Sequence, residues 1–477
     1  MMEVRSSNFI PLAEVAIANG DLQKAVQKGT GNAVAKRQLA VFAEGQAHGE
    51  AMRQQAAEAK RRALRHLPDL LEQAERQMTA NGFQVMWASS GAEVIDQVRA
   101  IAKRHAVQHI VKAKSMISEE IALNHALEAD GLHVVETDLG EFIVQLAGET
   151  PSHIVTPIIH KTKESIRDVM VRELNMPYTD DANEMAMFAR RYLRDIFLKA
   201  EMGISGGNFI IAETGTLCLV TNEGNGRLCT TLPPVHVALV GIEKIVATVE
   251  DYATLTQMLP RSATGQAMTV YTQMINGPRR AGDADGPEHV YVIFVDNGRS
   301  DIYATAYAEA LACIRCGACL NACPVYQATG GHAYGWVYSG PIGAVITPLL
   351  TGIENATPLP YASSLCGRCK QVCPVDIDLP RMLLDLRHDA VQAKEVGAGW
   401  RLGMKLWALG MQSPALYRLG GAVVRNAMRF FGQGEMIRSL PFMSAWTKHR
   451  DFPKFAPKPF RQLWQERQAA KQRGQTQ

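Results

Sequence analysis

The stretch CIRCGACLNACP, from Cys313 to Pro324, is followed about forty residues later by CGRCKQVCP, from Cys366 to Pro374. Together the two runs contain seven of the nine cysteines in the chain. The first run has the spacing C-x2-C-x2-C-x3-C-P, which bacterial ferredoxins use to bind iron–sulfur clusters. Thiolates are soft ligands that favour iron–sulfur clusters, zinc or copper(I). The two runs therefore predict a domain built around iron–sulfur clusters.

The step of three residues before each Cys-Pro pair directs the last cysteine of a run away from the others. In ferredoxins with two clusters, that cysteine binds the other cluster. One cluster is therefore predicted on Cys313, Cys316, Cys319 and Cys373, and the second on Cys323, Cys366 and Cys369.

The second set has only three thiolates. If the second run followed the full pattern, its first cysteine would stand at the position of Ser363. The second centre is then either a [3Fe-4S] cluster or a [4Fe-4S] cluster whose last iron binds Ser363, water, a substrate or a partner. The spacing leaves both alternatives open. Zinc also binds paired CxxC runs, but its sites need no C-x2-C-x2-C-x3-C-P arrangement, so iron–sulfur is favoured.

The composition is that of an ordinary globular protein with two or three domains: 477 residues, 47% hydrophobic and 20% charged. A net charge of +3 is too small to indicate nucleic-acid binding. The start, MMEVR, has an acidic residue where a signal peptide has basic ones, and no apolar run reaches the ~18–20 residues of a membrane span. Because thiols stay reduced in the cytoplasm, we expect a cytoplasmic protein.

Four domains are predicted along the chain. The first is a polar helical segment, 1–75, and the second is an α/β domain, 76–300, in which short apolar strands alternate with helices. A two-cluster domain, 301–385, and a helical C-terminal domain, 386–477, follow. Basic residues of the first segment predict a solvated helix face: Lys36, Arg37, Arg53, Lys60, Arg61 and Arg62.

The tail from Lys448 onward is basic and aromatic. It holds eight Lys or Arg residues against Asp451 and Glu466, with three Phe and one Trp between them. This pattern indicates contact with a membrane surface or with another subunit. The alternative is a solvated tail without a partner.

No organic-cofactor motif accompanies the cysteines. The chain has no G-x-G-x-x-G after a strand and no G-x-x-x-x-G-K-[ST], so neither a hydride carrier nor a nucleotide is indicated. Two clusters that transfer single electrons indicate a relay. Glu213, beside Gly215 in a strand-rich stretch, is either a catalytic carboxylate or a residue of a tight turn.

Other polar residues have plainer interpretations. We expect Asp296 and Arg299 to form an ion pair that fixes a turn rather than an anion site. His332 is expected to be a hydrogen-bonded loop residue rather than a ligand or a proton relay. Cys218 and Cys229 are expected to be small buried residues.

With these residues considered, the chain resembles the lactate utilization protein B family, the iron–sulfur subunit of a bacterial L-lactate oxidation system. Three stretches carry the resemblance: AETGT (212–216), DNGRS (296–300), and CIRCGACLNACPVYQATGGHAYGWVYSGPIGA (313–344) followed by CGRCKQVCPVDI (366–377). The cysteine spacing is shared with subunits resembling glycolate oxidase and succinate dehydrogenase. GGHAYGW joined to an upstream α/β domain is much more specific.

The resemblance implies an N-terminal LUD domain, similar in fold to the sugar-isomerase and CoA-transferase superfamily. It also implies two [4Fe-4S] clusters, a helical C-terminal domain, and partners resembling lactate utilization proteins A and C. The family's ligand pattern falls on the seven cysteines named above, with three on the second cluster. Such a system oxidises L-lactate to pyruvate and passes the electrons to the respiratory chain.

The leading hypothesis is therefore an iron–sulfur electron-transfer subunit of an L-lactate dehydrogenase complex. It would be a non-catalytic or co-catalytic part of that oxidoreductase, in the cytoplasm or at the inner face of the membrane. Two alternatives stay open: a LUD domain that is itself catalytic through Glu213, and a redox-sensing iron–sulfur scaffold.

Overall fold

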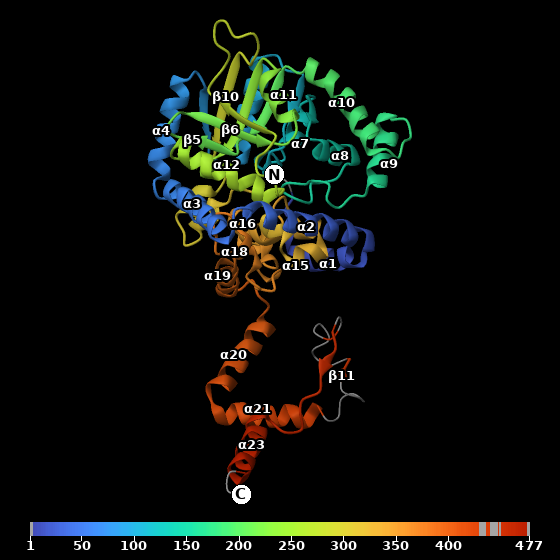
Figure 1. The fold of residues 1–477 in the computed structure, drawn as a ribbon, viewed down its shortest axis with the longest axis vertical. Coiled ribbons are helices and arrows are strands. Elements are labelled where there is room, and N and C mark those ends of the chain that lie inside the picture. Colours follow the sequence, from blue (N-terminus) through green and yellow to red (C-terminus); the bar gives the residue numbers. More distant parts are fainter. Residues whose placement is uncertain (1–2, 429–435, 439–446, 448–449, 475–477) are drawn as a thin grey trace. The chain divides into compact units, whose positions relative to one another are not determined.

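The computed structural model describes residues 3–428, 436–438, 447 and 450–474. The chain divides into two compact units, Met1–Glu395 and Val396–Gln477. The larger unit holds an α/β domain and both cysteine runs (Figure 1).

A six-stranded parallel sheet forms the centre of the α/β domain, in the order β1-β10-β7-β4-β2-β3. Its strands are β1 (Gln84–Ala88), β2 (His109–Lys112), β3 (His133–Glu136), β4 (Met202–Gly206), β7 (Val235–Gly241) and β10 (His289–Val295). Every residue of β7 is buried, as expected for a parallel strand covered on both faces. The alternation of strands and helices in the sequence thus gave the correct α/β class.

Helices cover both faces of this sheet. On one face lie α5 (Gly91–Arg104), α6 (Met116–Glu120) and α7 (Leu123–Ala129), whose apolar residues form one core with the strands. On the other face, α4 (Leu67–Ala80) packs over residues of β7 and β10. The remaining helices of the domain are α8 (Leu139–Ala147), α9 (Lys163–Leu174), α10 (Ala182–Lys199), α11 (Asn225–Thr231) and α12 (Val249–Ala263).

The helical period over residues 115–129 predicts one helix, but the structure has two. Ser115 caps α6, as its position in the sequence predicts, by accepting a hydrogen bond from the Ser118 N–H. Ala122 then adopts a left-handed conformation with φ of 53°, which ends α6 before α7 begins. The break follows Glu120, a fully buried residue that pairs with Arg299, far away in the sequence.

A second sheet of four strands has the order β8-β5-β6-β9. These are β5 (Phe209–Ile211), β6 (Thr216–Thr221), β8 (Ile245–Val246) and β9 (Tyr271–Ile275). The AETGT run makes the turn between the antiparallel strands β5 and β6. Gly215 has φ of +62°, and a Cβ there would lie 2.5 Å from the backbone nitrogen of Met78, so the turn requires glycine.

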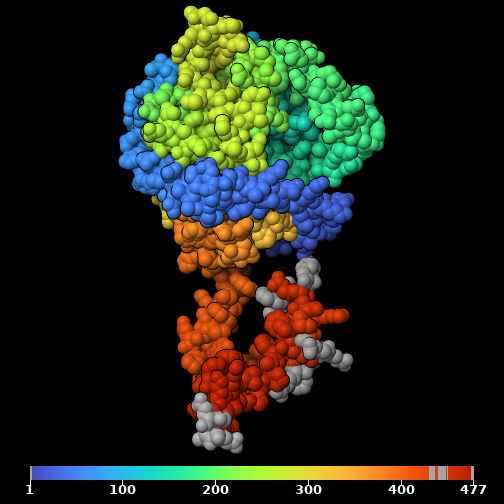
Figure 2. Space-filling view, in the orientation of Figure 1, coloured from blue at the N-terminus to red at the C-terminus, as the bar shows by residue number. Residues whose placement is uncertain are grey.

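The N-terminal helices α1 (Phe9–Ala18), α2 (Gly20–Val41) and α3 (Gln46–Arg65) lie between the α/β domain and the cysteine runs. Helix α2 contacts α12 on one side and α14 (Ala318–Asn321) and α15 (Pro324–Thr329) on the other. Figure 2 shows these helices as a blue band between the two parts of the larger unit.

The segment with the cysteine runs is short-helical. Besides α14 and α15 it contains α13 (Arg299–Tyr303), α16 (Gly340–Thr351), α17 (Ile353–Ala356), α18 (Arg368–Val372), α19 (Leu379–Gln392) and three 3-10 turns, Ala308–Ala312, His332–Tyr334 and Leu359–Tyr361. Its buried residues form one core with residues of α1, α2 and α3. The segment therefore folds against the N-terminal helices.

The smaller unit contains α20 (Ala398–Gln412), α21 (Pro414–Ala427), β11 (Met436–Ile437), β12 (Phe452–Pro453) and α23 (Phe460–Gly474). The sequence predicts helices over 400–443, of which 429–435 and 439–446 lie outside the described residues. Neither α20 nor α21 buries any residue. Among the described residues, no helix combines the length and apolarity that crossing a membrane demands.

A buried ion network joins the ends of several sheet strands. Arg299, which follows β10, contacts Glu120 at 2.6 Å and Glu243, just after β7, at 2.8 Å, and all three side chains are at most 1% exposed. The Tyr338 hydroxyl, from the cysteine segment, donates to Glu120. The Arg315 guanidinium lies 4.5 Å from the centre of the Tyr338 ring. The network thus connects the sheet to the first cysteine run.

We expect the variant Arg299→Met to lower the free energy of unfolding by about 3–5 kcal/mol, because it leaves two buried carboxylates without their partner. The matched control is Arg99→Met, which removes a half-exposed pair with Asp130 and should cost less than about 1 kcal/mol. Urea unfolding of both variants, prepared anaerobically, measures the difference. Equal effects of the two substitutions would contradict the role given to the network.

Candidate iron–sulfur centres and the adjoining cavities

The structure brings Cys313, Cys316, Cys319 and Cys373 together, and all four line one small cavity. Burial, followed by the charge of Cys373, raises the pKa of Cys316 to about 12. Burial and the other three thiols of this group raise the pKa of Cys319 as well. The four thiols therefore lie close in space, although Cys373 is more than fifty residues from Cys319.

Backbone N–H groups point at the sulfur atoms of this first group. The N–H of Arg315 donates to Cys313 Sγ and that of Ile377 donates to Cys373 Sγ, each at 3.4 Å. Each donor follows the sulfur it contacts within four residues, so the loop that carries a cysteine also solvates it. Hydrogen bonds of this kind stabilise the negative charge of bound thiolates.

Cys323, Cys366 and Cys369 form a second group. Burial, followed by the charge of Cys323, raises the pKa of Cys369 to about 12. Cys366 differs because it is exposed, and the Arg368 N–H is the main reason why its pKa is lowered. The first group is therefore enclosed, whereas the second reaches the surface.

The residues present fit iron–sulfur clusters. Buried thiols with raised pKa values lose their protons when a cation takes their place, which couples metal binding to deprotonation. Among the described residues, no three His, Cys, Asp or Glu groups converge as a single metal ion requires. An iron–sulfur cluster does not require such convergence, because each thiolate binds a different iron atom.

Ser363, the sequence-based candidate for a fourth ligand of the second centre, accepts a hydrogen bond from the Leu365 N–H at 3.1 Å. The neighbouring Ser364 side chain forms a hydrogen bond with Cys366. The Arg368 N–H lowers the pKa of Cys366 most, burial acts in the opposite direction, and Ser364 lowers the pKa further. Ser364 was not singled out from the sequence, because the ferredoxin spacing points one residue earlier.

The expectation of a solvated face for the basic N-terminal residues is wrong for three of them. Arg37, Arg53 and Lys60 are 5%, 8% and 1% exposed. The Arg53 Nε donates to the Cys373 carbonyl at 3.1 Å, and Arg37 lies within electrostatic reach of Cys316 and Cys373. The helical period could not reveal this, since only the tertiary fold places α2 and α3 against the cysteine runs.

Glu213 lies on the surface, where its Oε2 accepts a hydrogen bond from the Val249 N–H at 3.0 Å. It lines neither the cavity among the four thiols nor either of the two larger cavities of the α/β domain. His332 is a hydrogen-bonded loop residue, as expected, and contacts the Thr150 carbonyl at 2.7 Å. Cys218 and Cys229 are fully buried, as expected.

The expected ion pair between Asp296 and Arg299 is wrong in its partners. The Arg299 guanidinium pairs with Glu120 and Glu243 and takes only the backbone carbonyl of Asp296. The Asp296 carboxylate instead accepts from the Ser300 N–H and hydroxyl, both at 2.6 Å. The turn is therefore held by contacts within the DNGRS run, whereas the side chain of Arg299 forms ion pairs in the protein interior.

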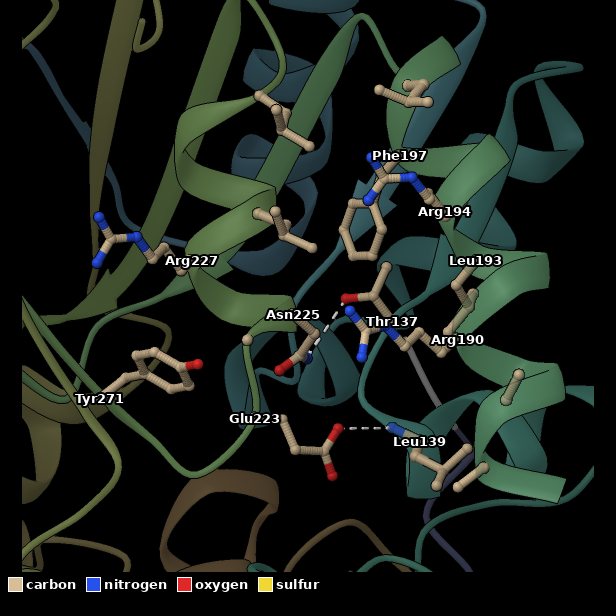
Figure 3. A pocket seen from close by; sticks show the side chains of 16 residues that line it. Thr137, Leu139, Arg190, Leu193, Arg194, Phe197, Glu223, Asn225, Arg227 and Tyr271 are labelled. Carbon is tan, nitrogen blue, oxygen red and sulfur yellow. Dashed lines mark hydrogen bonds between the residues drawn. The ribbon is translucent and has the colours of Figure 1, made fainter. Parts of the chain in front are cut away.

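Two larger cavities lie in the α/β domain. A groove of about 650 Å³ runs between α10 and α11, whose side chains, including Phe197 and Asn225, form its walls (Figure 3). A second cavity of about 380 Å³ lies where the sheet meets the cysteine segment, and Lys114, Lys244 and Arg315 are among its lining residues. Lys244 was not identified from the sequence as a residue of this cavity. Its position directly after a buried strand was the signal that could have identified it.

Family comparisons agree with this architecture. The LUD domain matches residues 71–295, a 4Fe-4S dicluster domain matches 309–377, and the C-terminal domain of lactate utilisation protein B matches 386–469. The dicluster match supports iron–sulfur clusters on the cysteines of residues 313–373.

Individual relatives cover most of the chain. Lactate utilization protein B of Bacillus licheniformis is 44% identical over 425 residues, covering 88% of this chain and 89% of its own. The protein of that name from Bacillus subtilis is 43% identical, covering 88% of each chain. A protein of Escherichia coli described as the uncharacterized electron transport protein YkgF is 40% identical, covering 98% of this chain and 99% of its own.

Among solved structures, a DUF162 family protein from Deinococcus radiodurans aligns with 48% of this chain and 98% of its own, at 14% identity. Its TM-score of 0.27 is too low to establish a shared fold. The two Bacillus relatives match this chain over 89% and 88% of their own length and share the name lactate utilization protein B. On their identity and coverage, the chain belongs to the lactate utilization protein B family.

Proposed function

We propose that this chain is the iron–sulfur electron-transfer subunit of a complex that oxidises L-lactate to pyruvate. The observation that carries the proposal is the division of seven cysteines into one enclosed group and one group at the surface of the same segment. The enclosed cluster would receive electrons in a site that excludes water, and the exposed cluster could pass them on to a partner. The names of the relatives connect this proposal to lactate utilization and to electron transport.

The proposed ligands follow the two groups of thiols. Cys313, Cys316, Cys319 and Cys373 would hold a [4Fe-4S] cluster, and Cys323, Cys366 and Cys369 would hold the second cluster. Exposure of Cys366 favours a [4Fe-4S] cluster whose last iron binds water or a partner group, since solvent reaches this site. A [3Fe-4S] cluster is the alternative. When bound, the clusters supply one-electron transfer.

The protein's own residues would set the environment of the first cluster. Backbone N–H groups contact its thiolates, and the guanidinium of Arg53 holds the carbonyl of Cys373 in place. Arg37 brings a second buried positive charge close to Cys316. Positive charge beside an anionic cluster stabilises the reduced form, so α2 and α3 would help to set the reduction potential.

Subunits resembling lactate utilization proteins A and C are the proposed partners, with an acceptor of the respiratory chain. We further propose that α20 and α21 rest on the membrane together with the basic tail. These helices expose Trp400, Trp407 and Leu409, carry four Lys or Arg, and contain no Asp or Glu. Such helices bind the interface of anionic bilayers.

Both alternatives from the sequence have less support. A catalytic Glu213 would need a substrate cavity, but its carboxylate is exposed and held by the start of α12. A redox-sensing scaffold would need no separate enclosed centre. The electron relay accounts for both the enclosed first group of thiols and the exposed Cys366 of the second group.

The cluster assignment predicts a selective loss of iron. Cys373→Ala should remove the first cluster, about four of about eight irons, and leave the electron paramagnetic resonance (EPR) signal of the second. Cys366→Ala should do the reverse. Iron analysis and EPR spectra before and after dithionite measure both. Cys218→Ala, a buried cysteine outside the two groups, is the control and should keep all the iron. Full iron content in Cys373→Ala would refute the assignment.

The relay predicts that L-lactate reduces both clusters anaerobically once partners resembling proteins A and C are added. Cluster reduction, followed by freeze-quench EPR, should keep pace with pyruvate formation. The idea fails if pyruvate forms with a respiratory acceptor while the clusters remain oxidised.

Membrane contact is checked by sedimentation with vesicles. The full chain should bind vesicles with about 30% phosphatidylglycerol and not those of phosphatidylcholine alone, and binding should weaken in about 0.5 M salt. Trp407→Ser should lower the bound fraction several-fold. Trp87→Ser, an exposed tryptophan of β1, is the matched control. Equal binding by the two variants would argue against α20 as the contact.

A further inference from the structure

The cavity of about 380 Å³ lies at the carboxyl ends of three central strands. Lys114 and Ser115 follow β2, Gly206 and Asn208 end or follow β4, and Lys244 follows β7. From β2 the chain continues outward to β3, whereas from β4 it continues to β7 on the other side. This is a topological switch point, where open parallel sheets bind ligands.

The first cysteine run closes the inner end of this cavity. Arg315, between Cys313 and Cys316, and Ile154 line both this cavity and the one among the four thiols of the first group. A molecule bound at the inner end would therefore lie against the loop of the first cluster.

The outer end leads to the surface. Glu223 and Asn225 line both the cavity and the groove between α10 and α11, and Figure 3 shows both residues facing that groove. Gly207 also lines the cavity, and it leaves no room for a side chain on its core side, because a Cβ would lie 2.9 Å from Leu217 and Val240.

At the inner end, polar atoms lack partners. The Lys244 Nζ is 3.9 Å from Glu243 Oε1 and the Arg315 Nη2 is 3.8 Å from the same oxygen, both beyond hydrogen-bond distance. Among the described residues, Glu243 Oε1 and Arg315 Nη1 are buried without any hydrogen bond. The other oxygen of Glu243 is held by Arg299 at 2.8 Å. One acceptor and two cationic donors are therefore available together.

The charges at this end favour an anion. Lys244, Arg315 and Arg299 face two carboxylates, Glu243 and Glu120, and Lys60, whose pKa burial and Lys244 lower to about 7, adds to the excess of positive charge. Burial would raise the pKa of Glu243, but Arg299, Lys244 and Arg315 outweigh it and hold the pKa at about 2. Lys114 lies close to other carboxylates, Glu141, Asp138 and Glu223, so it offers less attraction to an anion.

We propose that the inner end of this cavity binds a small 2-hydroxy carboxylate, its carboxylate on Lys244 and Arg315 and its hydroxyl donating to Glu243 Oε1. The choice of this ligand class rests on the proposed function; the donor and acceptor pattern rests on the structure alone. The LUD domain and the first cysteine run thus form one substrate site on this chain. Glu213 is not part of this site.

Isothermal titration of the cluster-loaded full chain, kept anaerobic, tests the proposal with L-lactate and propionate as probes. L-lactate should bind with Kd of about 1 mM or tighter. Propionate has the same carboxylate without the hydroxyl, so it should bind about tenfold more weakly, because Glu243 Oε1 then stays unpaired. This comparison needs no variant and so does not depend on how a substitution folds.

Lys244→Met should weaken L-lactate binding at least about tenfold, since it removes a charged hydrogen-bond donor. Lys161→Met is the matched control, because Lys161 is also a poorly exposed lysine near a glutamate but lies outside the cavity, and this variant should bind L-lactate normally. Circular dichroism confirms that both variants are folded. Absent L-lactate binding, equal affinity for propionate, or unchanged affinity in Lys244→Met would each overturn the proposal.

The result is distinguishable from a failure of the relay. If the wild-type chain binds no L-lactate but its clusters are reduced by L-lactate through partners, the relay stands and this site is wrong. If L-lactate binds as described but the clusters never become reduced in the assembled complex, the site stands and the relay is wrong.

Discussion

The arrangement of this chain depends on the ion pairs that the buried Arg299 forms with two carboxylates. A guanidinium that is 1% exposed must be matched by carboxylates, because burying an unpaired charge costs several kcal/mol. Glu120 supplies one from the end of α6, after β2, and Glu243 supplies the other from a 3-10 helix after β7. The requirement that these groups meet fixes how the strand ends of the sheet come together.

That same network extends to the cysteine segment. Tyr338 donates to Glu120, and Arg315 stacks on Tyr338 while its backbone N–H contacts Cys313. The orientation of the first cysteine loop is thus tied to the sheet by buried, directional contacts rather than by apolar packing alone. Directional contacts allow few alternative arrangements, so a cavity at the strand ends and a thiol-lined site can share Arg315 as a common wall.

The N-terminal helices complete the enclosure from the other side. Their buried basic residues, Arg37 and Arg53, lie near Cys373, and their apolar residues join the core of the cysteine segment. A cluster site enclosed by a sheet domain and by helices from the opposite end of the chain can form only after distant segments have folded together. The exposed Cys366, by contrast, belongs to a short local loop, which explains why the two thiol groups differ in access to solvent.

The sequence by itself determined the α/β class and the domain with two cysteine runs, because apolar periodicity and ligand spacing are local patterns. It also determined the family, through motifs such as GGHAYGW. The proposed assignment of ligands to clusters came from spacing as well, and the four-domain division of the chain stays a prediction. The partners of Arg299, the burial of Arg37, Arg53 and Lys60, and the meeting of Lys244 with Arg315 were decided only by the tertiary structure. These contacts join residues far apart in sequence, and no local pattern records which strand ends a folded sheet places side by side.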